Sequence, residues 1–111
     1  MIEALWSVEF KSNNNFAGSG IVVFETGRVL GGDSMMTYIG SYDVANGVVS
    51  ATISVKQYSN TSNMASVVGL NQFTLAVKGT IARQSMTLSG YVVEDNSKTI
   101  VINAQRQAEL P

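Results

Sequence analysis

The fold is decided by one stretch, Gly31–Tyr42, which reads GGDSMMTYIGSY. Its paired glycines relax the backbone, and the Asp-Ser pair that follows has side chains short enough to hydrogen-bond to nearby backbone groups, so Gly31–Asp33 predicts a corner of the chain. After this corner, Tyr38, Gly40 and Tyr42 alternate onto one face of a strand. A glycine within a strand marks a bend, a bulge or a close backbone approach. We therefore expect a corner followed by a bent barrel strand; the alternative is that the two tyrosines flank a small ligand pocket.

Alternating apolar and polar residues recur on both sides of this stretch and predict short strands. Asn46-Gly47 lies between two alternating runs and is the strongest short hairpin signal, because a type I′ turn needs positive φ at both central residues. Polar turns are expected at 11–15 and 94–97, and the polar loop 59–66 has room for one turn of helix. The eight expected strands are Leu5–Phe10, Gly18–Glu25, Arg28–Leu30, Thr37–Val44, Val48–Tyr58, Gln72–Lys78, Met86–Glu94 and Thr99–Arg106.

These strands predict an all-β fold, because helical periodicity is nowhere sustained. Tight turns join successive strands without a long crossover segment, so the strands form an antiparallel meander. Closing the meander into an eight-stranded, up-and-down, lipocalin-like β-barrel removes the exposed edges. The chain has 111 residues, and we expect a single domain over 1–111. An open sandwich is the alternative.

The composition argues against catalysis and metal binding. The chain has no cysteine and no histidine, which removes the common triads and most transition-metal ligands. Its carboxylates share no motif spacing. We therefore expect no enzymatic activity, no catalytic residue, no cofactor and no metal site.

Charge and hydropathy limit the partners in the same way. The net charge is −1 and the basic residues are scattered singly, whereas direct binding of nucleic acid needs a basic cluster. No stretch has the length of a signal peptide or a membrane helix. We expect a cytoplasmic protein that binds neither nucleic acid nor membrane.

About the first half of the chain carries four short motifs: Trp6-Ser7-Val8-Glu9-Phe10-Lys11-Ser12, Gly18-Ser19-Gly20-Ile21, Gly27 leading to Gly31-Gly32-Asp33, and Tyr38-Ile39-Gly40. These motifs resemble those of the GrlR-like family, the small β-barrel negative regulators of type III secretion genes. The resemblance implies a lipocalin-like barrel that forms a homodimer and sequesters a transcriptional activator by protein–protein contact. The family's type member carries an acidic run after the Tyr-x-Gly strand, where this chain has one acidic residue, Asp43.

Two groups of residues are candidates for a functional site. The first would line a cavity, although strands this short favour a barrel filled by its own side chains. Arg83 and Gln84 could add polar groups to the interior, the alternative being a solvated turn. The candidate lining residues are Trp6, Tyr38, Tyr42, Phe73 and Met86.

The second group would form a partner or dimer surface. Methionine suits adaptable contact surfaces, and these apolar residues flank loops; the alternative is that they cap the barrel ends. The candidate surface residues are Met35, Met36, Asp43, Val67, Val68 and Leu70. Regulatory binding of a protein partner is the expected function. The alternative is a module that binds a small apolar ligand, which an apolar cavity of about 300 Å³ or more would favour.

Overall fold

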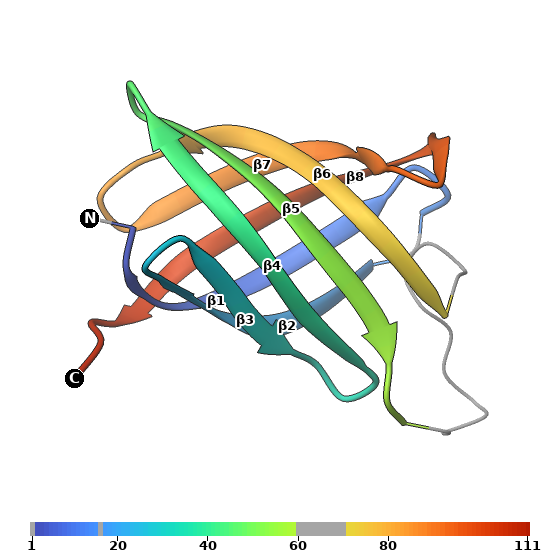
Figure 1. The fold of residues 1–111 in the computed structure, drawn as a ribbon, viewed down its shortest axis with the longest axis horizontal. Coiled ribbons are helices and arrows are strands. Elements are labelled where there is room, and N and C mark those ends of the chain that lie inside the picture. The colour runs from blue at the N-terminus through green and yellow to red at the C-terminus, as the bar shows by residue number, and fades with distance from the viewer. Residues whose placement is uncertain (1, 16, 60–70) are drawn as a thin grey trace.

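The chain forms a closed antiparallel β-barrel, which confirms the expected fold class (Figure 1). A computed structural model describes residues 2–15, 17–59 and 71–111. Each strand pairs with the next along the chain, and the last pairs with the first. The strands are β1 (Ala4–Ser12), β2 (Ala17–Glu25), β3 (Arg28–Gly32), β4 (Met36–Ala45), β5 (Val48–Gln57), β6 (Gln72–Ile81), β7 (Ser85–Val92) and β8 (Asp95–Ala108).

Alternation along the strands places one set of side chains inside the barrel. In β5, Val49, Ala51, Ile53 and Val55 are all buried, while the polar residues between them face outward. The inward residues of the other strands join them in one hydrophobic core. Burial of this apolar set is the dominant stabilising term, and it also sets the register, since a slip of one residue would expose the whole set.

Two tight hairpins have the left-handed backbone that type I′ turns require. Asn46 and Gly47 have φ values of 54° and 77°, which confirms the hairpin between β4 and β5. Thr26 and Gly27 have φ values of 51° and 78° between β2 and β3. A β-branched residue rarely adopts positive φ. Here the Thr26 amide donates a hydrogen bond to the Glu3 carboxylate at 2.7 Å, which helps to hold that conformation.

Several element boundaries differ from those expected. Gly31 and Gly32 belong to β3, so the corner lies later, at 33–35. β6 continues to Ile81, three residues beyond the expected end at Lys78. The turn expected at 94–97 is wrong: β7 ends at Val92 and β8 already begins at Asp95. The turn at 93–94 is stabilised because Val93 N–H donates to the Thr74 carbonyl at 2.8 Å, so the polar run that follows is free to pair. Most of 59–66 lies outside the described residues.

Gly40 marks a close approach of two strands, one of the possibilities expected for a strand glycine. A Cβ atom at Gly40 would lie 2.1 Å from the Thr52 carbonyl oxygen and 2.8 Å from the Ile53 Cα atom. Glycine therefore allows β4 to bend tightly against β5 on the inner face. Bends of this kind let short strands close into a narrow barrel.

Candidate functional site

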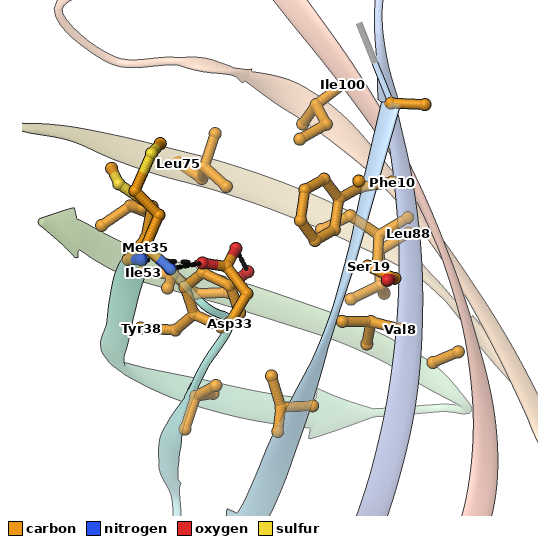
Figure 2. A pocket seen from close by; sticks show the side chains of 18 of the residues that line it. Val8, Phe10, Ser19, Asp33, Met35, Tyr38, Ile53, Leu75, Leu88 and Ile100 are labelled. Carbon is orange, nitrogen blue, oxygen red and sulfur yellow. Dashed lines mark hydrogen bonds between the residues drawn. The ribbon is translucent and has the colours of Figure 1, made fainter. Parts of the chain in front are cut away.

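The barrel interior holds an apolar cavity of about 270 Å³, so the expectation of a completely filled core is wrong (Figure 2). At one end it is bounded by the small residues Ala17, Gly18 and Ser19 of β2 and by the corner after β3. The lining residues come from all the strands and the corner: Val8, Phe10, Ala17, Gly18, Ser19, Val22, Phe24, Val29, Asp33, Ser34, Met35, Met36, Tyr38, Ile53, Val55, Phe73, Leu75, Met86, Leu88, Ile100, Ile102 and Ala104.

Both termini lie at one end of the barrel (Figure 1). Aromatic rings pack together at this end. Trp6 is fully buried, and its indole N–H donates a hydrogen bond to the Ile2 carbonyl at 2.9 Å. Its ring meets Phe24 edge-on, with centroids 6.5 Å apart, and the Arg106 guanidinium lies 4.8 Å from the ring centroid. Tyr42 packs against Phe24 at 5.1 Å. We call Trp6, Phe24 and Tyr42 the aromatic plug.

The opposite end is organised by the Asp33 carboxylate. One oxygen, Oδ1, accepts the backbone N–H groups of Met35 and Met36 at 2.8 and 2.7 Å, which closes the corner between β3 and β4 as an Asx-type turn. The other, Oδ2, accepts the Tyr38 hydroxyl. The Tyr58 hydroxyl donates to the Asp33 carbonyl at 2.7 Å. These contacts fix a carboxylate at the edge of an apolar cavity (Figure 2).

Tyr38 carries this polar contact into the cavity. Gly20 leaves the space for it, because a Cβ atom at Gly20 would lie 2.9 Å from the Tyr38 hydroxyl oxygen. Phe10 meets the Tyr38 ring edge-on at 6.2 Å. Burial, and then the hydrogen bond and negative charge of Asp33, raise the pKa of Tyr38 far above its usual value. The hydroxyl therefore stays protonated and donates to Asp33 over the whole ordinary pH range.

The charge inside this site has one sign. Among the described residues that line the cavity, Asp33 is the one formally charged group, and none is a lysine or an arginine. The described residues hold no group of three acidic side chains that could bind a metal ion. Within the same ranges, no helix has the length and apolarity needed to cross a membrane. The site is thus an apolar chamber with a single anionic edge.

The structure brings together three of the five residues expected to line a cavity. Tyr38, Phe73 and Met86 line it, but Trp6 and Tyr42 do not. Trp6 lies near the start of β1 and Tyr42 near the end of β4, so both side chains belong to the aromatic plug and not to the cavity wall. The alternative pocket between Tyr38 and Tyr42 is therefore not formed; the space lies on the far side of Tyr38.

Of the residues expected to form a partner surface, the structure describes Met35, Met36 and Asp43, and these three do not share a surface. Met35 and Met36 are only 4% and 3% exposed and line the cavity, so as surface residues they are wrong; they cap the barrel end. The Asx-type turn explains this, because it folds both methionines inward. Asp43 is exposed on β4, toward the plugged end. Val67, Val68 and Leu70 lie outside the described residues.

Arg83 and Gln84 lie in the exposed turn between β6 and β7, so the solvated-turn alternative is right. Their backbone carbonyls accept hydrogen bonds from Arg106, at 3.0 Å from its side chain and 2.9 Å from its amide. Neither residue lines the cavity.

An apolar row crosses the outside of the barrel instead. Leu5 pairs with Val23, Val23 with Leu30, and Leu30 with Ile39, so the four side chains lie side by side over β1 to β4. Ile39 is 59% exposed and Leu30 is 39% exposed. We call these four residues the outer apolar row.

Sequence reasoning missed the second role of Asp33. Asp33 was expected to shape the corner, and it does. Its hydrogen bond to Tyr38 also depends on the space that Gly20 of β2 leaves for the Tyr38 hydroxyl inside the barrel. Phe10, Leu75 and Leu88 were also missed as lining residues. The inward alternation of their strands was visible, but alternation does not show where along the barrel axis a space remains.

Comparison with solved structures supports the class of fold that these observations define, a small closed β-barrel. A structure described as that of a redesigned β-barrel is similar, with a TM-score of 0.50 and 8% sequence identity over 96% of this chain and 91% of that one. At this identity the likeness shows the fold alone. No protein-family model and no curated protein matches the chain.

Proposed function

We propose that this barrel binds a small apolar molecule in its interior. The observation that carries the proposal is the apolar cavity with one fixed polar pair, Asp33 and Tyr38, at its edge. Its volume of about 270 Å³ is slightly below the ~300 Å³ expected of a ligand pocket. Small-molecule sites are concave and mostly apolar, with a few placed polar groups. An engineered cavity of about 150 Å³ binds benzene, so this one has room for about ten non-hydrogen atoms.

An empty cavity destabilises a protein, so larger side chains would normally fill such a space. A barrel selected for stability alone would gain from larger residues at several lining positions. Retention of the space beside a preorganised carboxylate supports binding as its purpose. A protein that binds a small ligand would use the inside of the barrel, whereas a regulator that binds a protein partner would use the outside.

A matched pair of substitutions tests the proposal. Val55 is 4% exposed and lines the cavity, whereas Val101 is 44% exposed on the outside of β8. We expect Val55→Phe to weaken binding of the neutral probe propylbenzene by about tenfold or more, because the new ring occupies the space the probe needs. Val101→Phe makes the same chemical change outside and should leave binding unchanged. The measurement is isothermal titration calorimetry; equal affinities in the two variants would contradict the proposal.

We also propose a second candidate, contact with a second copy of this chain, which the outer apolar row supports. Contiguous exposed apolar side chains on a monomer mark contact sites, and a two-fold dimer is the commonest way to cover them. This is the assembly that the resemblance to GrlR-like regulators implies. Regulation by capture of a transcriptional activator would then need a further surface, and it stays a prediction, as does the cytoplasmic location.

Light scattering tests the dimer. The native chain should have the mass of a dimer at micromolar concentration, and Ile39→Lys should give a monomer, because it places a charge within the outer apolar row. Thr52→Lys, at an exposed position of β5, is the control and should remain dimeric. A monomeric native protein would rule this candidate out.

A further inference from the structure

The polar edge of the cavity restricts which apolar molecules fit. The Asp33 carboxylate lies within the wall, and its two oxygens accept three donors from described residues: Met35 N–H, Met36 N–H and the Tyr38 hydroxyl. An ionised carboxylate has about four acceptor sites, and a phenol oxygen can accept as well as donate. The pair therefore offers acceptors to a bound molecule, and no described lining residue offers a cationic donor.

The position of the pair sets the orientation of such a molecule. Ser34 and Ala17 are exposed lining residues, so the cavity reaches the surface near Asp33, while its deeper walls come from apolar side chains such as Ile53, Leu75 and Leu88. Figure 2 shows the carboxylate beside the Tyr38 ring, and Phe10 packs edge-on against that ring. A molecule with one polar end would place that end at Asp33 and its apolar body inward.

Charge decides which polar end is favoured. A carboxylate attracts a cation and repels a second carboxylate, and both effects are stronger at a half-buried group such as Asp33 than in bulk solvent. We infer that the ligand is a small apolar amine, with its ammonium group at Asp33 and Tyr38 and an apolar body of one ring or a short chain in the cavity. This inference rests on the proposed function.

The test compares three probes that share a phenyl body: 2-phenylethylamine, its neutral isostere propylbenzene, and phenylacetate. Titration calorimetry near neutral pH should give the amine about tenfold or greater advantage over propylbenzene, since a hydrogen bond to a charged group is worth that much. Phenylacetate should bind more weakly than propylbenzene.

Two variants test whether the negative charge of Asp33, and not the shape of the cavity, causes the preference for the amine. Asp33→Asn keeps an oxygen that can accept the two backbone N–H groups of the turn, and it should reduce the affinity for the amine to that for propylbenzene. Tyr38→Phe leaves the carboxylate in place, so the preference for the amine should persist. Far-ultraviolet circular dichroism establishes that both variants are folded.

The possible results separate failure of the amine inference from failure of the proposed ligand binding. If propylbenzene binds and the amine binds no better, or if the advantage of the amine survives in Asp33→Asn, the inference is overturned while the cavity keeps its proposed function. If none of the three probes binds, both the inference and the proposed function fail.

Discussion

Asp33 shows how much one side chain can organise at the scale of a single residue. Its carboxylate accepts the backbone N–H groups of the turn between β3 and β4 and also accepts the Tyr38 hydroxyl. Its backbone carbonyl accepts the Tyr58 hydroxyl. A short acidic side chain suits this place, because it reaches backbone N–H groups two and three residues ahead. The same contacts that shape the corner therefore hold the polar edge of the cavity in one position.

The raised pKa of Tyr38 leads to a prediction at high pH. The folded protein keeps this hydroxyl protonated, whereas an exposed tyrosine in the unfolded chain ionises near pH 10. The contribution to stability is thus complete below about pH 10 and is lost as the pH rises further. Thermal melting followed by circular dichroism should show the native midpoint falling more steeply above that pH than the midpoint of Tyr38→Phe.

Tyr91→Phe is the control for this prediction, since Tyr91 is an exposed tyrosine on the outside of β7. It should keep the native dependence on pH. Parallel curves for the native protein and Tyr38→Phe would show that ionisation of this hydroxyl is not coupled to unfolding.

At the scale of elements, strand identity could be predicted well, because alternation reports burial directly. The hairpin at Asn46-Gly47 could also be placed, since few residues tolerate positive φ. The ends of β7 and β8 were misplaced for a different reason. Asp95 and Asn96 have polar, turn-favouring side chains, yet the backbone there pairs because strand partners outweigh local propensity.

The close approach at Gly40 makes a prediction about strand packing. Gly40→Ala should destabilise the protein by about 2 kcal/mol, because the added methyl group meets the backbone of β5 and the strands must separate. Ser41→Ala, at the adjacent outward position, should change stability by less than about 0.5 kcal/mol. Urea denaturation measures both; equal effects would show that β4 has room to move on its inner face.

At the scale of the whole molecule, the barrel closes only when its first and last strands meet. Leu5 pairs with Ala108 and Trp6 with Arg106, so the closing contacts join residues far apart in the chain. Forming such contacts costs loop entropy before it gains contact energy. Topologies dominated by distant pairings fold slowly for this reason.

Refolding should therefore take milliseconds to seconds, the range of other all-β domains. Trp6 reports on closure, because its buried ring contacts Arg106 of β8. Stopped-flow fluorescence after dilution from urea gives the rate. Recovery of the native Trp6 signal within microseconds would contradict closure as the slow step.

The cavity itself belongs to this largest scale, which explains why the sequence did not reveal it. Each strand shows which residues point inward, but the volume left over depends on how all the strands stagger around the axis. Trp6 looked like a wall of the space because it is large and inward-facing. It proved to be part of the aromatic plug, because its strand enters the barrel at the end opposite Asp33.

The aromatic plug also has a consequence for exchange rates. With Trp6, Phe24 and Tyr42 packed across one end, a molecule would enter and leave by the same route, past Asp33 and Ser34. A change that only narrows this route slows arrival and departure by the same factor and leaves the equilibrium untouched. A substitution deep in the cavity wall that weakens or strengthens binding changes the rate of departure alone. Speed and tightness of binding are therefore properties of different parts of the barrel, and each could be adjusted without the other.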